Sequence, residues 1–257
     1  MKKINNNIEF IFYSGKQADY DFDCKAKTEF RKIGNYYKML ASEIVNNTNK
    51  ILLMDSGDTL TQKDLSEIFF FDLENNYFGW ILEDAAGNNE KYDSFFRNKF
   101  YANSGICLIN VKLFRKDNLY EKIYYSRLAY EELPCPFQDI FLTISNYKFK
   151  YFPLKYNLKQ LFTEEKEIYS DHINSIYFNE WINRQKNSPF KYSKDEILEA
   201  VLDPVVIHLY GVKIENGKIN KKYTIQWIKY AKMTGYYNEI KKKYPSPFLK
   251  YEDLLFS

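Results

Sequence analysis

Apolar and polar positions alternate along the chain as short strand-like runs and longer helix-like segments. The run ILLM at 51–54 is continuously apolar, as in a strand that is buried on both faces of a sheet. The polar, aromatic and irregular stretch 160–194 predicts a loop-rich insertion. The expected strands are 8–13, 51–54, 77–82, 105–111, 148–153 and 204–211, and the expected helices are 34–45, 64–70, 117–133, 138–145 and 224–243. This alternation predicts an α/β fold with a mostly parallel central sheet, in which ligands bind beyond the carboxyl ends of the strands.

Length and charge narrow the class of protein. The 257 residues, 45% of them hydrophobic, suit one large domain, which we place at 1–237 with a C-terminal tail at 238–257. The net charge of +3 produces no field that indicates a nucleic-acid partner. No apolar run reaches the roughly 18 residues of a membrane-spanning helix, and the start of the chain lacks the apolar core of a signal peptide. We therefore expect a cytoplasmic protein.

Two further features bear on compartment and partners. The cysteines at 24, 107 and 135 are far apart in sequence, so they predict neither a disulfide framework nor a zinc site. The basic and aromatic C-terminal segment KKKYPSPFLKYEDLLF leaves two interpretations open. Either it contacts the inner face of a membrane, near a lipid-linked acceptor, or its clustered lysines are the solvated end of a helix.

Two carboxylates follow the buried strand at 51–54 directly. Asp55 and Asp58 lie in the sequence MDSGD, where Gly57 permits a tight turn that brings both side chains toward one point. Carboxylate oxygens suit Mg²⁺ or Mn²⁺, and such ions bind one or two carboxylates together with substrate phosphates. The alternative is that Asp and Gly only form a turn after a strand.

Several segments, taken in order, resemble the family 8 retaining glycosyltransferases of the lipopolysaccharide type. The resemblance extends from about Ile33 to Tyr237, and the segment with Asn-Ser-Gly at 103–105 is its most specific part. The segments that carry it are GNYYKMLASEIV, ILLMDSGDTLTQKDLSEIF, FYANSGICLINVKLFRK, FQDIF and VVIHLYGVK. The resemblance implies a glycosyltransferase A-type fold.

The resemblance also assigns roles to individual residues. Asn103 and the backbone near Ser104 and Gly105 face the transferred sugar. Gln138 lies beneath that sugar, and Asp84 approaches it. His208 joins the two aspartates around the metal, whereas Gly211 and Lys213 hold the diphosphate. The full assignment is Gln138, Asn103 and Asp84 as catalytic residues, Lys38, Ser56, Ser104, Gly211 and Lys213 in cofactor binding, and Asp55, Asp58 and His208 as metal ligands.

The chain also departs from the family pattern. Phe137 replaces the first acid of the Asp-Gln-Asp motif, of which Gln138 and Asp139 remain, and Leu142 replaces an Asn that the family often has. Lys38 replaces an Arg that binds the donor, which keeps the charge but loses the planar fork. Only about thirty residues precede the Tyr-Tyr-Lys helix, so we expect the strand that binds the nucleotide base to be missing.

The resemblance implies transfer of a hexose, glucose or galactose, from a UDP-sugar to a saccharide or lipid-linked acceptor. The transfer would retain the anomeric configuration and depend on Mn²⁺ or Mg²⁺. Two alternatives remain at this point: a non-catalytic or truncated relic that no longer binds the nucleotide sugar, and a metal-free carbohydrate-binding module that stacks sugars on its many aromatic side chains.

Overall fold

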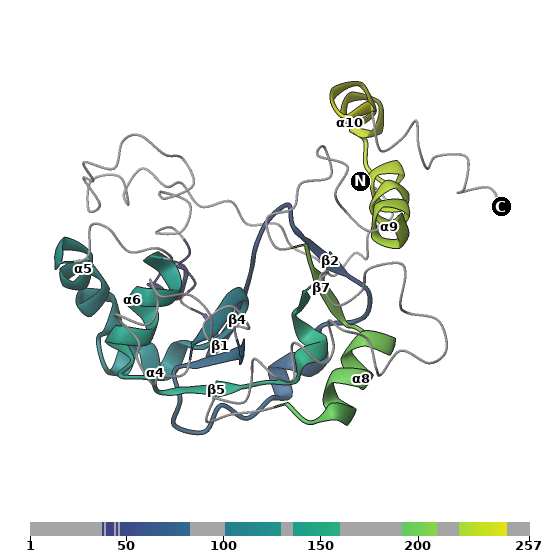
Figure 1. The fold of residues 1–257 in the computed structure, drawn as a ribbon. Coiled ribbons are helices and arrows are strands. Elements are labelled where there is room, and N and C mark those ends of the chain that lie inside the picture. The colour runs from purple at the N-terminus through teal and green to yellow at the C-terminus, as the bar shows by residue number, and fades with distance from the viewer. Residues whose placement is uncertain are drawn as a thin grey trace.

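The structure is a computed structural model, and it describes residues 38, 40–43, 45, 47–82, 101–129, 136–159, 192–209 and 221–245 (Figure 1). Residues 38 and 40–43 are helical, within the helix expected at 34–45, and the strand expected at 8–13 lies outside the described residues. The further elements are β1 Lys50–Met54, β2 Thr59–Thr61, η1 Ser66–Phe70, β3 Phe78–Leu82, β4 Ala102–Asn110, α4 Val111–Lys116, α5 Leu119–Ala129, α6 Pro136–Ile144, β5 Phe149–Tyr151, η3 Leu154–Tyr156, β6 Leu158–Lys159, α8 Lys194–Leu202, β7 Val206–His208, α9 Lys221–Lys232 and α10 Tyr237–Lys243.

The main sheet has the strand order β1-β4-β3-β5 within the described residues. β4 is antiparallel to both of its neighbours, β1 and β3, whereas β5 is parallel to β3. The predicted α/β fold is therefore confirmed, but the described sheet is mixed rather than mostly parallel. The sequence could not show the direction of these pairings, because a strand buried on both faces has the same apolar pattern whichever way its neighbours run.

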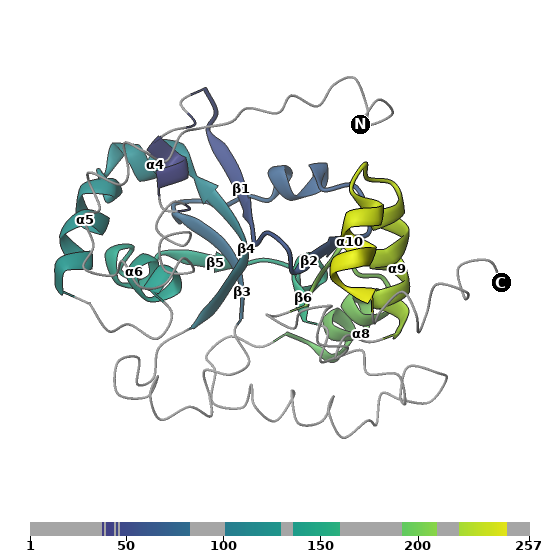
Figure 2. The same ribbon diagram turned by 90° about the horizontal axis from the view of Figure 1, so that it is seen from above.

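A second, smaller sheet has the order β2-β7-β6, with β2 antiparallel and β6 parallel to β7. The sequence did not predict β2 and β6, because runs of three and two residues are too short to show a periodicity. Figures 1 and 2 show α4, α5 and α6 beside the main sheet, and α8, α9 and α10 on the side of the smaller sheet.

β4 is the central strand, and its side chains enter two cores alternately. Cys107 and Ile109 belong to the aromatic core beneath α4–α6, whereas Ile106 and Leu108 belong to a core shared with η3 and α8. In the first core the ring of Phe78 meets that of Phe141 edge-on at 4.6 Å between centroids. The strand is therefore buried on both faces and is held rigidly between the two cores.

Two expectations about helices and loops are corrected or refined. The helix expected at 224–243 is interrupted, because the Thr234 hydroxyl donates to the Ala231 carbonyl at 2.8 Å and so completes the end of α9. α8 begins at the end of the expected loop, where Ser193 and Glu196 form a reciprocal capping box. The predicted domain boundary at 237 coincides with the start of α10. Within the described residues, no helix is long and apolar enough to cross a membrane.

Candidate metal centre

The two predicted carboxylates lie where the main sheet passes into the smaller one. β1 ends at Met54, and the amide of Asp55 still donates to the carbonyl of Gly105 on β4 at 2.8 Å. The chain then turns through Gly57, whose φ of +88° is in the region that favours glycine. Asp58 follows at the start of β2, so one aspartate belongs to each sheet.

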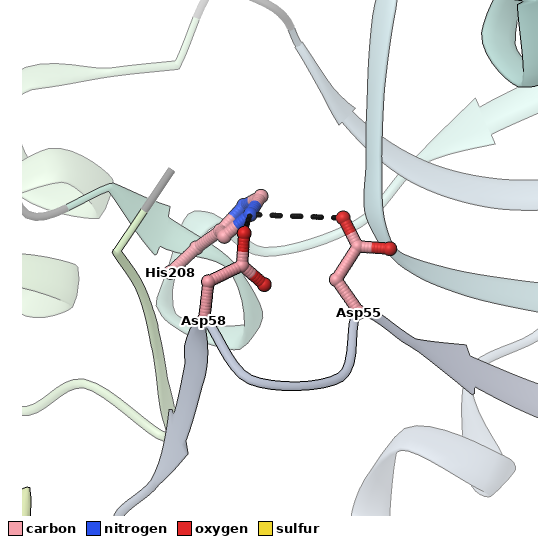
Figure 3. A group of neighbouring side chains, drawn as sticks. All are labelled: Asp55, Asp58 and His208. Carbon is pink, nitrogen blue, oxygen red and sulfur yellow. Dashed lines mark ion pairs between the residues drawn. The ribbon is translucent and has the colours of Figure 1, made fainter. Parts of the chain in front are cut away.

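His208 reaches this turn although it lies 150 residues after Asp58 in the sequence. It is the last residue of β7, where it pairs with Thr59 of β2, and the next amide, that of Leu209, donates to the Asp58 carbonyl at 2.6 Å. The imidazole Nε2 lies 3.8 Å from Asp55 Oδ2 and 3.5 Å from Asp58 Oδ2. Figure 3 shows the three side chains directed toward one another.

This cluster fits a divalent cation. One ligand atom from each of the three residues lies within 4.8 Å of the other two. Around an octahedral ion with bonds of about 2.1 Å, ligand atoms are separated by about 3 Å when adjacent and by about 4.2 Å when opposite. The two distances from His208 Nε2 to the carboxylates, 3.8 Å and 3.5 Å, fall between these values. Two carboxylates and an imidazole are a donor set that suits Mn²⁺, while Mg²⁺ favours oxygen ligands alone.

Gly105 provides the space for the imidazole. A Cβ atom built on Gly105 would overlap ring atoms Cε1 and Nδ1 of His208, at separations that real Cβ atoms essentially never show, and would lie 3.0 Å from Asn103 Oδ1. The His208 ring therefore lies against bare backbone of β4 and is only 3% exposed. The resemblance named the backbone near Gly105, but no local signal could show that a distant histidine packs on it.

Lys38 adds a cation to the same cluster. Its ammonium forms an ion pair with Asp55, and both side chains are about three-quarters buried. Burial lowers the pKa of Lys38, while the negative charge of Asp58 opposes this shift. The ammonium also lies 5.5 Å from the centre of the Phe137 ring, a cation–π contact. The aromatic side chain that replaces an acid in the family motif thus faces the lysine that replaces an arginine.

The structure also brings together two other predicted residues. The Ser104 hydroxyl on β4 donates to Oε1 of Gln138 at 3.2 Å, and Gln138 lies in the first turn of α6, which begins at Pro136. The adjacent Asp139 is buried and accepts a hydrogen bond from the Tyr101 hydroxyl at 2.8 Å. These contacts fix the start of α6 against the start of β4.

Asn103 is buried within β4 rather than in a turn before it. Its Oδ1 accepts hydrogen bonds from the Gly105 amide at 3.0 Å and from Nδ2 of Asn157 at 2.9 Å. Sequence reasoning missed Asn157, which lies between η3 and β6. Ser56 is in the exposed part of the turn between the two aspartates. The predicted residues Asp84, Gly211 and Lys213 lie outside the described residues.

A comparison with known families shows to which family this chain belongs. The family described as "Glycosyl transferase family 8" matches residues 1–213. The chain belongs to glycosyl transferase family 8. The metal ligands predicted from that resemblance are thus the residues that the fold gathers at one point, although their roles stay predictions.

Curated relatives of this family 8 chain are distant. A lipopolysaccharide 1,2-glucosyltransferase of Escherichia coli is 26% identical over 155 residues, which are 58% of this chain and 44% of the relative. A putative glycosyltransferase of Haemophilus influenzae is 26% identical over 150 residues, 54% of this chain and 44% of the relative. The match with the chain therefore spans less than half the length of either relative.

Solved structures agree on the fold. The galactosyltransferase LgtC, in complex with donor and acceptor sugar analogues, is 20% identical and has a TM-score of 0.56, over 82% of this chain and 69% of LgtC. The bifunctional glycosyltransferase WbbM is 17% identical with a TM-score of 0.57, over 84% of this chain and 38% of WbbM. At these identities the likeness shows the glycosyltransferase A-type fold and no more.

Proposed function

We propose that this family 8 chain transfers a hexose from a UDP-sugar to a saccharide or lipid-linked acceptor, with retention and with Mn²⁺ or Mg²⁺. One observation carries the proposal. Asp55, Asp58 and His208 come from two sheets, and the histidine lies 150 residues after Asp58, yet their ligand atoms meet within 4.8 Å. A turn that served structure alone would not require the histidine.

The reaction has a simple balance of bonds. The bond between the anomeric carbon and the β-phosphate oxygen breaks, and its electron pair leaves with UDP. A new bond forms from the acceptor hydroxyl oxygen to the same face of the anomeric carbon, and the hydroxyl proton passes to the departing phosphate. A metal ion held by Asp55, Asp58 and His208 would supply positive charge that stabilises this diphosphate.

The remaining residues act by position and charge. Lys38 adds a cation beside the carboxylates, as the leaving group gains charge. Gln138 and Ser104 are held to each other next to the centre, where we propose that they contact the donor together with Asn103. Ser56 is proposed as a contact of the diphosphate from the exposed turn. Asp84, Gly211 and Lys213 remain proposed donor-binding residues on the strength of the family pattern.

Glucose and galactose are the proposed sugars because of the relatives. One curated relative is a lipopolysaccharide 1,2-glucosyltransferase, and LgtC is a galactosyltransferase. The proposed acceptor is a saccharide of that kind, met at the cytoplasmic face of a membrane. The last turn of α10, with Lys241, Lys242 and Lys243, and the exposed Met233 and Tyr236 support a peripheral contact with anionic lipid.

Calorimetric titration with UDP tests the proposal. We expect wild-type protein to bind UDP only when Mn²⁺ is present, and we expect Asp55→Ala to abolish this binding. Asp72→Ala is the matched control, because among the described residues the exposed Asp72 carboxylate accepts a hydrogen bond only from a turn amide, that of Glu74 at 2.8 Å. If folded wild-type protein fails to bind UDP with Mn²⁺, the chain is a relic of the fold and the proposal is wrong.

A further inference from the structure

The candidate metal centre lies at the junction between the main sheet and the smaller sheet, which we call the seam. Asp55 follows β1 of the main sheet, whereas Asp58 directly precedes β2 of the smaller sheet and His208 ends β7. Metal–ligand distances tolerate only about ±0.2 Å. The relative position of the two sheets must therefore be fixed closely, and the short turn at Gly57 alone is a poor means of doing so.

A buried side-chain hydrogen bond joins the two sheets beside this seam. Asn103 lies on β4 of the main sheet, and Asn157 immediately precedes β6, which pairs in parallel with β7, so that Lys159 stands opposite His208. Nδ2 of Asn157 donates to Oδ1 of Asn103 at 2.9 Å, and the exposed fractions of the two side chains are 0% and 2%. The bond therefore links β4, on which the imidazole ring packs, to β6 and β7, the strand pair that includes His208.

The backbone determines the orientation of the side-chain amides of Asn103 and Asn157. The amide of Gly105 donates to Oδ1 of Asn103 at 3.0 Å, so the oxygen of Asn103 must face this point. Asn157 can then only present its NH₂ to the same oxygen. As a result, Oδ1 of Asn157 is buried without a hydrogen-bond partner among the described residues. An unsatisfied buried acceptor is costly, and such groups persist where another requirement outweighs the cost.

β4 is irregular where Asn103 and Gly105 lie, and for this reason the strand needs the hydrogen bond from Asn157. The register between β3 and β4 passes from Gly79 opposite Leu108 to Ile81 opposite Asn103, so one residue of β3 faces four residues of β4. Gly105 lies within this bulge, and its amide donates to the side chain of Asn103. Bulges of this kind re-aim the chain next to functional sites.

We infer that Asn157 is a positioning residue of the metal centre, which acts through Asn103 to hold the Gly105 backbone and the His208 strand in register. The inference rests on the proposed function, because it requires that the cluster binds a divalent ion. Asn157 touches neither ion nor donor. Its effect is on the geometry in which His208 meets the two carboxylates.

Mn²⁺ affinity, measured from the electron paramagnetic resonance signal of the free aqueous ion, tests the inference with MnCl₂ as the probe. We expect Asn157→Ala and Asn103→Ala each to weaken Mn²⁺ binding by about tenfold, the lower end of the loss seen when outer-shell partners of a metal are removed. The double variant should lose no more than either single variant, because the two side chains form one link. Fully additive losses would overturn the inference.

Two further variants separate positioning from stability. Asn157→Leu keeps the number and branching of the side-chain heavy atoms and removes the unsatisfied acceptor, so it should fold and still bind Mn²⁺ about tenfold more weakly. Asn110→Ala is the matched control, because Asn110 caps α4 at the opposite end of β4, roughly 23 Å along the strand from Asn103. It should lower stability and leave Mn²⁺ affinity unchanged. Folded Asn157→Leu with wild-type affinity overturns the inference alone, whereas wild-type protein that binds no Mn²⁺ overturns the metal site as well.

Discussion

Gly105→Ala should damage the metal centre without introducing a charge or removing a ligand. The new methyl group would overlap Cε1 and Nδ1 of His208. Since carbon atoms pack at about 3.5 Å, the ring would have to retreat by roughly 1 Å. The backbone of β4 cannot yield instead, because it is hydrogen-bonded to β1 and buried between two cores.

A displacement of this size is several times the tolerance of a metal–ligand bond, which is about 0.2 Å. His208 Nε2 would then no longer reach the ion that both carboxylates hold. We expect Mn²⁺ binding to weaken by at least about tenfold, which corresponds to about 1.4 kcal/mol. The overlap itself should also lower the free energy of unfolding by about 1–3 kcal/mol, as overpacking of a buried site does.

Two other glycines serve as controls in the same assay. A methyl group on Gly79 would meet Phe152 Cδ1 at 2.8 Å and Leu73 Cδ2 at 2.9 Å, so Gly79→Ala overpacks the core away from the metal centre. A Cβ on Gly235 would have no atom within 4 Å. Gly79→Ala should lose stability and keep its Mn²⁺ affinity, and Gly235→Ala should change neither. Electron paramagnetic resonance gives the affinity, and urea denaturation gives the free energy of unfolding.

The reasoning would be refuted by folded Gly105→Ala protein that binds Mn²⁺ as tightly as wild type. In that case His208 would not be a ligand, and the close packing of its ring on β4 would be structural. Equal losses of Mn²⁺ affinity in Gly105→Ala and Gly79→Ala would also count against it, because the effect would then follow from general destabilisation.

Three further predictions concern single side chains. Lys38→Met removes the ammonium that competes with the metal ion for Asp55, and this partly exposed ion pair is worth about 1 kcal/mol. In the absence of nucleotide, Mn²⁺ should therefore bind roughly fivefold more tightly to the variant. Weaker binding would contradict this prediction. Ser193→Ala removes the capping box of α8 and should lower the free energy of unfolding by about 1 kcal/mol in urea, and an unchanged midpoint would count against it. Burial and the hydrogen bond to Asp117 raise the pKa of Tyr77 to about 12, whereas an unfolded tyrosine ionises near pH 10. The folded chain thus holds an extra proton between these values, and stability falls as the pH rises through them, so Tyr77→Phe should lose less stability between about pH 9 and pH 11 in urea titrations than wild type does.

Local patterns were sufficient for part of the fold and part of the site. The continuous apolar run at 51–54 predicted β1, and the turn residues after it predicted that Asp55 and Asp58 converge. Both follow from interactions within a few residues, namely burial of one strand and the turn conformation that Gly57 allows. His208 was identified only through its resemblance to a family, because a histidine at the end of an apolar strand has no local mark of a metal ligand.

The tertiary structure alone decided the rest. Pairing direction is one example: β4 runs antiparallel to β1, so Asn103 and Gly105 reach the site at the amino end of their strand. Asn157 joins Asn103 across 54 residues of sequence, and Gly105 meets a ring that is about a hundred residues away. Hydrophobic periodicity reports which face of an element is buried, but it carries no information on which partner covers that face. For this reason the sequence by itself determined the elements and the two carboxylates, whereas the seam between the sheets and the residues that hold it emerged only from the fold.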